Sequence, residues 1–463
     1  MNPSSILEQI DKTQDDAIAR LKDLLSIPSI STDPAYRPHV HDAARWVADH
    51  LRETGLNAEV CPTAGHPVVL ARTTDDDVQN PAAPRVLFYG HYDVQPPDPV
   101  EKWTTPPFQP DVRDGKLYAR GASDDKGQVM CFLEALRAYK LAGVKLPCHV
   151  TVMIEGEEEC GSVGLPGFLQ EYREQLKADI AVVSDTTMWD ADTPAITYAL
   201  RGLVYFDIKL HGPTRDLHSG VYGGTLANPA TMLARVLGKL FGEDNRVTIP
   251  GFYDDVAPLD EEETQRWAVL GFNERDFLDP VGAKPFGEAG YSTLERRWAR
   301  PSCDVNGLYG GYMGEGAKTV IPSYAGAKVS FRLPANMNPD KVAQQFIGWL
   351  EAQDTGGCRW EITQHGKAYP VAVPIDSPFI AAAGRAMERA KGRPPVLVRD
   401  GATIPVIADF KRLLGLDTLL LGFGLNDDNI HSPDECFGLD RFQLGCRTHA
   451  MLLEQVAAIT TTG

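Results

Sequence analysis

The sequence has no long apolar run, no C-x-x-C pair and no G-x-S-x-G segment. A helix that spans a membrane needs about 20 mostly apolar residues, so we expect no membrane partner. Because the eight cysteines are scattered along the chain, they are expected to be separate reduced thiols and not metal-binding or redox pairs. The absence of G-x-S-x-G removes the usual marker of a serine hydrolase of the α/β type.

Positive charge is also scarce. The formal net charge of −18 argues against nucleic acid or an anionic membrane as a partner. Residues 1–6 show no basic region followed by an apolar segment, so no signal peptide is expected. Together with the scattered thiols, this predicts a cytoplasmic location.

The apolar pattern changes twice along the 463 residues. Before about residue 197, and again after 370, helical spacing alternates with short β-branched runs, which is typical of a doubly wound α/β sheet. Between these limits, strands such as 205–210 alternate as half-exposed strands do, in an α+β order. We therefore predict a mixed-sheet α/β domain interrupted by an inserted α+β domain. The predicted domains are 1–197, 198–370 and 371–463.

The expected elements follow this pattern. Helices are expected near residues 6–25, 42–51, 129–143, 165–176, 229–241, 261–269, 341–350, 380–390 and 442–459. Strands are expected at residues 68–71, 85–89, 149–154, 180–183, 205–210, 329–333, 360–363 and 418–421.

Three glutamates, Glu157, Glu158 and Glu159, follow the buried strand 149–154. In open α/β sheets the carboxyl ends of the strands are where ligands bind. Neighbouring carboxylates repel one another, and a multivalent cation would remove that cost. A solvated acidic loop is the alternative interpretation.

Other strand ends carry further metal-ligand residue types, which favours the cation. His91, Asp124 and Asp185 each lie in a loop at the end of a predicted strand, and His431 lies beyond the predicted strand that ends at residue 421. Either histidine alone could be structural. With Glu159 they make a set of two histidines and three carboxylates, all of which can meet at one edge of the sheet.

This set suits zinc or manganese, because its donors are imidazole nitrogens and carboxylate oxygens without thiolates. Five ligands exceed what one tetrahedral zinc with an open position needs, but they fit two ions if one carboxylate bridges them. Such a site acidifies a shared water and polarises a carbonyl. Glu158, beside a ligand, would be the general base, and Asp93 would fix the tautomer of His91.

Five segments together resemble one known family. They are Gly-His-Tyr-Asp-Val at 90–94, Gly-Ala-Ser-Asp-Asp-Lys-Gly at 121–127, Glu-Glu-Glu-Cys-Gly-Ser at 157–162, Ser-Asp at 184–185 and Ile-His-Ser-Pro-Asp-Glu at 430–435. They are similar to those of the di-metal metallopeptidases that include aminoacylase, bacterial carboxypeptidase G and the carnosinases. Segments 215–220, 304–307 and 318–322 look most like the carnosinase and cytosolic non-specific dipeptidase branch.

The resemblance implies roles for the metal ligands. Asp124 would bridge two divalent ions, zinc or alternatively manganese. His91 and Asp185 would hold one ion, and Glu159 and His431 the other. The peptide bond between Asp124 and Asp125 would be cis.

The resemblance also implies that the inserted domain is a lid and a dimerisation domain. His218 would reach the active site of the other subunit of a homodimer and stabilise the oxyanion there. Thr319 and Arg332 match lid positions that grip a short peptide substrate. Residues 401–405 read Gly-Ala-Thr-Ile-Pro where the family usually has Gly-Gly-Ser-Ile-Pro, so Thr403 would bind the substrate carboxylate through a threonine hydroxyl.

Three functions stay open at this point. The first is hydrolysis of the amide bond of dipeptides or short peptides by a water that bridges the metals. The second is deacylation of N-acyl amino acids at the same centre. The third is a non-catalytic protein that uses the lid only for association. The presence of Glu158 and of every ligand argues against the third function, whereas the first two differ only in the pocket for the substrate's amino end.

Overall fold

The computed structural model describes residues 4–459 and divides them into two units. The first unit holds the chain up to Tyr198, Val373–Val398 and the chain from Asp409 onwards, and the second holds Ala199–Ala372 and Arg399–Ala408. The predicted absence of a signal peptide at residues 1–6 concerns a segment that lies partly outside the described residues. The domain boundaries at 197 and 370 stay a prediction, because a unit defined by contacts is not by itself a domain that folds independently.

A mixed sheet forms the centre of the first unit, in the order β1-β2-β6-β3-β7-β17-β8. β3 is parallel to β6 and β7, and β17 is parallel to β7, whereas β1, β2 and β8 run antiparallel to their neighbours. All six residues of β3 and all four of β7 are buried, which explains their nearly continuous apolar sequence. The strands are β1 (Asn57–Cys61), β2 (Val68–Arg72), β3 (Val86–His91), β6 (Val150–Glu155), β7 (Ile180–Val183), β8 (Ala195–Leu200) and β17 (Thr418–Leu420), and β15 (Val371–Ala372) and β16 (Val396–Asp400) pair with β8.

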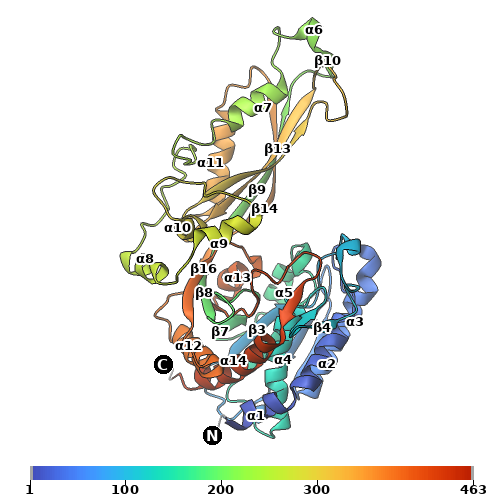
Figure 1. Ribbon diagram of the computed structural model, residues 1–463, viewed down its shortest axis with the longest axis vertical. Helices are drawn as coiled ribbons and strands as arrows, with labels where there is room; N and C mark the ends of the chain where they lie inside the picture. The colour runs from blue at the N-terminus through green and yellow to red at the C-terminus, as the bar shows by residue number, and fades with distance from the viewer. Residues whose placement is uncertain (1–3, 460–463) are drawn as a thin grey trace. The chain divides into compact units, whose positions relative to one another are not determined.

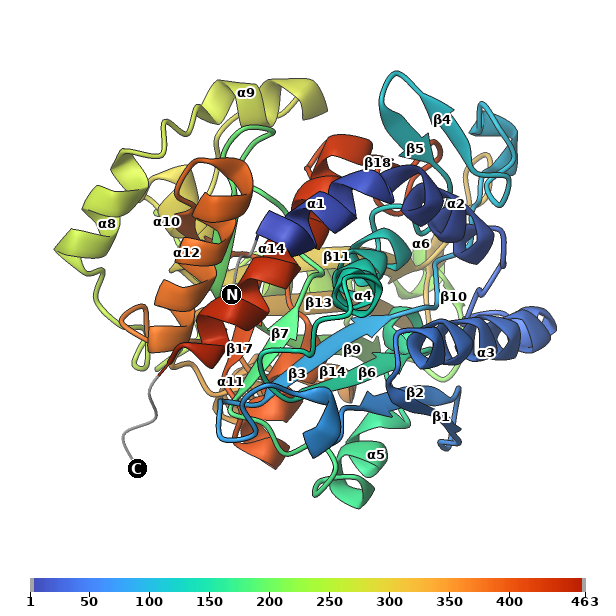
Figure 2. The same ribbon diagram turned by 90° about the horizontal axis from the view of Figure 1, so that it is seen from below.

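Helices cover both faces of this sheet. Figure 2 shows α4 (Lys126–Leu141) and α14 (Leu439–Ala457) on one side of β3, β6 and β7, and α5 (Leu165–Glu171) on the other. α4 is buried on nearly every side because it lies between the sheet and other helices. The remaining helices of this unit are α1 (Ser4–Lys12), α2 (Gln14–Leu25), η1 (Pro34–Tyr36), α3 (Arg37–Glu53), η2 (Asp75–Asp77), η3 (Val100–Lys102), η4 (Glu158–Cys160), α12 (Pro378–Lys391) and η6 (Phe410–Leu414), and α13 (Pro405–Asp409) crosses from one unit to the other.

Two predicted helices differ in extent from those observed. The helix predicted over residues 6–25 is two helices, because Thr13 bonds back to Gln9 O through its hydroxyl and leaves the helical conformation. The helix predicted over residues 165–176 ends at Glu171. In residues 4–459, every helix is either too short or too polar to span a bilayer.

The second unit contains an antiparallel sheet in the order β11-β13-β9-β14. Buried and half-buried residues alternate along the whole of β9, so one face of the sheet packs on α7 and α11 while the other carries polar side chains. The strands are β9 (Gly202–His211), β11 (Ser302–Gly310), β13 (Tyr324–Leu333) and β14 (Arg359–Ala368), with a separate pair, β10 (Leu217–His218) and β12 (Val320–Ile321). The helices are α6 (Ser219–Tyr222), α7 (Pro229–Leu237), α8 (Glu261–Ala268), α9 (Glu274–Leu278), η5 (Asp279–Val281), α10 (Thr293–Trp298) and α11 (Pro339–Glu351) (Figure 1). The predicted doubly wound α/β fold with an inserted α+β part is confirmed.

Candidate metal centre

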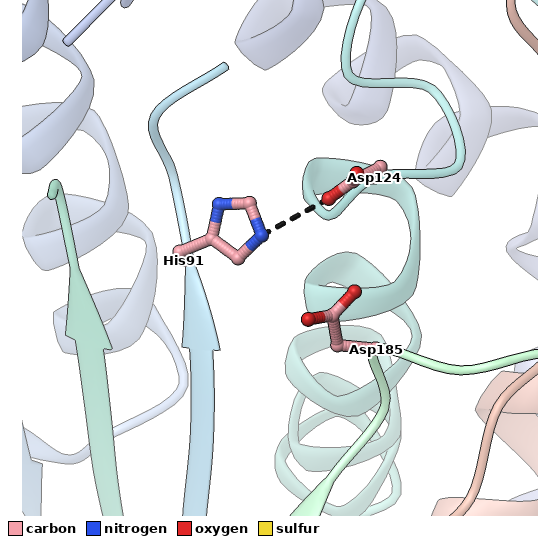
Figure 3. Close-up of side chains that lie close together, drawn as sticks. All are labelled: His91, Asp124 and Asp185. Carbon is pink, nitrogen blue, oxygen red and sulfur yellow. Dashed lines mark ion pairs between the residues drawn. The ribbon is translucent and has the colours of Figure 1, made fainter. Parts of the chain in front are cut away.

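His91 is the last residue of β3, and its ring is completely buried. Its Nδ1 lies 3.1 Å from the carbonyl oxygen of Asp93 and 3.4 Å from Asp93 Oδ1. This leaves Nε2 directed at Asp124, whose Oδ1 is 3.1 Å away (Figure 3). Nε2 makes no hydrogen bond there, so the nitrogen is placed as a metal ligand would be.

Asp124 lies in the loop between β5 (Lys116–Tyr118) and α4. β5 belongs to a small three-stranded sheet with β4 (Asp111–Arg113) and β18 (Cys436–Gly438), so Asp124 does not come from a strand end of the central sheet as the sequence suggested. The backbone N–H of Asp124 donates to Glu435 Oε1 at 3.1 Å. The peptide bond between Asp124 and Asp125 is cis, as expected.

Glu158 and Glu159 lie in η4, directly beyond β6. Their backbone N–H groups donate to the two oxygens of Asp93, at 3.3 and 3.0 Å. Asp93 therefore contacts both His91 and the turn that carries the two glutamates. The amide of Gln95 donates to Glu159 Oε2 at 2.8 Å, which fixes the direction of this carboxylate.

Asp185 and His431 complete the set. Asp185 follows β7 and its carboxylate points to the space that His91 and Asp124 face (Figure 3). His431 lies in the loop between β17 and β18, and its Nε2 is 3.0 Å from Asp124 Oδ2 and 3.4 Å from Glu159 Oε2. Two groups result, and within each the ligand atoms lie within 4.8 Å of one another. The groups are His91, Asp124 and Asp185, and Asp124, Glu159 and His431.

The pKa values of the candidate ligands indicate whether cations would fit between them. Burial raises the pKa of Asp185 well above its ordinary value, and the negative charges of Asp124 and Asp125 raise it further. The hydrogen bond that His431 donates to Asp124 raises the pKa of His431 to about 10, with a smaller contribution from the hydrogen bond to Glu159. Protons are thus held between these residues, where two cations that share Asp124 would relieve the same repulsion. The residues fit a pair of divalent metal ions.

Glu158 has the properties of a general base. Burial raises the pKa of its carboxyl group to about 7, which the positive charge of His91 opposes and the Glu159 carboxylate supports. A base with a pKa near neutral is the most effective one at neutral pH.

The four predicted substrate-binding residues form two pairs in the second unit. His218 is paired with Val320 across β10 and β12, and the N–H of Ser219 donates to Thr319 O at 3.1 Å. Arg332 Nη1 donates to Thr403 Oγ1 at 2.8 Å. The structure brings together the members of each pair but not the two pairs, which lie near opposite ends of β13.

Sequence reasoning missed Gln95, Arg120 and the role of Glu435. Gln95 follows Asp93 by two residues and could have been suspected from that position. Glu435 is part of the Ile-His-Ser-Pro-Asp-Glu segment, but its partner Arg120 is 315 residues away in the chain, and no local pattern relates them.

Comparison with known proteins shows which family has similar sequences. Residues 87–455 match the family model described as peptidase family M20/M25/M40. The chain is 32% identical to the Cys-Gly metallodipeptidase dug1 of Schizosaccharomyces pombe over 481 aligned positions, covering 99% of both chains. It is 31% identical to the human Beta-Ala-His dipeptidase, covering 99% of this chain and 94% of the relative.

Solved structures agree with this family. Human carnosine dipeptidase 1 matches with a TM-score of 0.83 and 30% identity, over 99% of both chains. An M20 family metallo-carboxypeptidase from Sulfolobus solfataricus matches with a TM-score of 0.85 and 31% identity, over 96% of this chain and 99% of the other. With its central sheet, its inserted unit and two ligand groups that share Asp124, the chain belongs to peptidase family M20/M25/M40.

Proposed function

We propose that the protein is a two-metal dipeptidase that hydrolyses the amide bond of dipeptides and other short peptides. The observation that carries this proposal is the pair of ligand groups sharing Asp124, in a chain similar over nearly its full length to two named dipeptidases. Asp124 would bridge, His91 and Asp185 would hold one ion, and Glu159 and His431 the other. Zinc is the proposed metal and manganese the alternative, because the ligands are nitrogen and oxygen.

The ions, when bound, would polarise the substrate carbonyl and acidify the attacking water. Glu158 takes a proton from that water and delivers it to the leaving amine nitrogen. Its burial next to Glu159 keeps its pKa near 7, so it can both accept and return the proton at neutral pH. Asp93 holds His91 with Nε2 directed inward, and it fixes the turn of Glu158 through two backbone N–H groups.

His218 is proposed to stabilise the oxyanion. Its Nδ1 accepts a hydrogen bond from the backbone N–H of Gly220 at 2.9 Å, so the neutral ring carries its proton on Nε2. The side chain is exposed, and Nε2 is therefore available to donate to an oxygen of the substrate.

Distance within the second unit supports the action of His218 in another subunit. Tyr324 and Arg332 lie near the two ends of β13, about 26 Å apart at the usual rise of a strand, and β10 lies beyond the Tyr324 end (Figure 1). An extended dipeptide spans only about 7 Å. If Arg332 with Thr403 binds the carboxylate end of a substrate, His218 and Thr319 of the same chain cannot reach that substrate.

We infer a homodimer through the inserted part, residues 198–370, with residues 1–197 and 371–463 forming the catalytic part. The two edge strands of the second sheet support this. β14 carries charged side chains such as Glu361 and Lys367, which discourage pairing, whereas β11 exposes Val305 and Leu308, and Met313 follows it with 76% of its surface exposed. Leu308→Lys should produce monomers by sedimentation, and Thr363→Lys, at an exposed position on the other edge strand β14, is the matched control.

A cytoplasmic location is proposed as well. All eight cysteines are free thiols in residues 4–459, which fits a reducing compartment.

The decisive experiment compares substrates on metal-depleted protein. Chelated protein should be inactive, and added zinc or manganese should restore hydrolysis of Cys-Gly and β-Ala-His. N-acetyl amino acids are the matched alternative substrates. Faster turnover of these would assign the protein as a deacylase, and full activity of protein shown to be metal-free would refute the metal mechanism.

A further inference from the structure

The carboxylate of Glu435 accepts four hydrogen bonds inside the first unit. Arg120 Nη1 and the N–H of Gly121 donate to Oε2, at 2.6 and 3.0 Å, and the N–H groups of Ser123 and Asp124 donate to Oε1, at 3.0 and 3.1 Å. Glu435 and Arg120 are both almost completely buried. Three of the four donors belong to the backbone of the loop that carries Asp124.

Glu435 itself belongs to a different loop, four residues after His431. We propose that Glu435 is a positioning residue that holds the loop of Asp124 and the loop of His431 together, and so builds the metal position that these two ligands share with Glu159. Its effect on the ion is indirect, through the backbone of both loops.

The two metal positions differ in how much they need such a residue. His91 and Asp185 extend directly from β3 and β7, neighbouring strands of the central sheet, so hydrogen bonding within the sheet fixes their spacing. His431 has no such support. It lies in a loop where Asn429, His431 and Asp434 all have left-handed backbone conformations, with φ of 56°, 60° and 58°. Asn, His and Asp adopt this conformation more readily than other non-glycine residues, so the residue types permit the irregular loop, but they do not fix its distance from the loop of Asp124.

Only a carboxylate matches the surroundings of Glu435. All four partners are donors, and an ionised carboxylate offers acceptors alone. A glutamine in the same place would direct its NH₂ group at two donors, whichever way its amide is turned, and a donor cannot accept their hydrogen bonds. Glu435→Gln therefore keeps the size of the side chain and removes the match on one oxygen.

The chain offers a matched control in Asp428. Its carboxylate is equally buried and also accepts four hydrogen bonds, from Arg441 (two), Ser123 Oγ and Leu425 N. None of these donors is the backbone N–H of a proposed metal ligand. Asp428→Asn should thus lower the melting temperature as Glu435→Gln does, while the backbone N–H groups of the Asp124 loop keep their hydrogen bonds to Glu435.

The inference rests on the proposed metal centre, and the test reads metal content and not activity. The three proteins are loaded with zinc, dialysed against a weak chelator and analysed for zinc by mass spectrometry. Wild type and Asp428→Asn should keep two ions per chain, whereas Glu435→Gln should keep one. Its weaker ion should dissociate with a Kd raised about 10- to 100-fold, the usual cost of losing an outer partner of a ligand.

Each outcome separates this inference from the metal centre itself. If wild type binds fewer than two ions, the proposed centre fails. If wild type binds two and Glu435→Gln binds them as tightly, or if Asp428→Asn loses an ion equally, the positioning role is overturned. Should Glu435→Gln not fold, Glu435→Asp keeps the charge opposite Arg120 but shortens the reach to Ser123 and Asp124, and it should show the same selective loss to a smaller degree.

Discussion

The two units differ in how many charged side chains they bury and in which groups these side chains contact. Among the described residues, the second unit buries three charged side chains, Glu263, Glu288 and Arg300, and each contacts an opposite charge. The first unit buries many more, and several of its buried carboxylates lie beside other carboxylates. Its buried acidic, basic and histidine side chains are His50, His91, Asp93, Arg120, Asp125, Lys126, Glu134, His149, Glu155, Glu157, Asp428, Glu435, Arg441 and His449.

The difference indicates which burial is structural and which is chemical. Burying an ion costs free energy that a well-placed partner can offset, as Arg300 and Glu288 do with two hydrogen bonds of 2.7 Å each. The carboxylates around Asp124 have too few cationic partners, and burial raises the pKa of both Asp185 and Glu158. Such uncompensated burial is typical of a site that binds cations or moves protons.

The largest expected effect is in the first unit. Glu158→Gln removes the proton acceptor, so kcat should fall by ~10² to 10⁴ while the metal content stays that of wild type. Steady-state kinetics and metal analysis measure the two quantities. Glu157→Gln is the control, since Glu157 Oε2 accepts from Gly164 N and Glu157 belongs to neither ligand group, and kcat should change little. An unchanged kcat in Glu158→Gln would mean that the base is another group.

The next largest effect is expected for His218, which lies in the second unit. His218→Ala should lower kcat by ~10² to 10³, the usual effect of removing an oxyanion donor. Mixing this inactive variant with Glu158→Gln under conditions that exchange subunits should restore activity, because one site of a mixed dimer then has neither defect. Proven exchange without recovery would place His218 in its own subunit or outside catalysis.

The buried ion pair of the second unit should matter for stability alone. Glu288→Gln leaves Arg300 buried without its carboxylate and should lower the free energy of unfolding by about 3–5 kcal/mol. Denaturant titration measures this change, and kcat of the folded protein should be that of wild type. Glu361→Gln on exposed β14 removes a solvated pair and should hardly change stability. A large loss of kcat in Glu288→Gln would contradict the separation between the units.

Acid should weaken the first unit through His50. Burial lowers the pKa of His50 to about 3, with help from the charges of Arg137 and Arg20, from an ordinary value of 6.5. Below pH 6.5 the unfolded chain therefore binds more protons than the folded chain. The contribution of neutral His50 to the free energy of unfolding is complete above that pH and declines as the pH falls, by about 2 kcal/mol at pH 5. His50→Gln should flatten the fall in stability between pH 6.5 and 5, whereas His365→Gln, at an exposed position in the second unit, should not. Equal slopes in all three proteins would exclude His50 as the cause.

Much of this arrangement could be predicted from local patterns. The buried runs at Ile180–Val183 and Thr418–Leu420 and the alternation in β9 each follow from a periodicity of a few residues. The residues of the two candidate ligand groups could be proposed from the sequence because they follow such runs or stand in motifs. β11 was missed because Asp304, Asn306 and Gly307 interrupt its sequence, and its strand conformation comes from pairing with β13.

Contacts between distant residues could not be predicted in the same way. Gln95 meets Glu159 and Glu435 meets Arg120 only once the sheet has formed, and each pair joins residues of ordinary type. Likewise, the sequence suggested that Thr403 binds substrate directly, a role that stays a prediction. In the structure its hydroxyl donates to Arg201 O at 2.6 Å and accepts from Arg332, a network that no motif reveals.

The place of β17 between β7 and β8 has a consequence for biosynthesis. A chain emerging from the ribosome presents β7 and β8 long before β17 is made, so the central sheet has a gap in the middle during most of translation. The four strands of the second sheet, in contrast, are all complete once Ala368 has emerged. The strands of the second sheet can therefore pair while the rest of the chain is still being synthesised, and if His431 is a metal ligand as proposed, a nascent chain would take up its second ion only after this residue has left the exit tunnel.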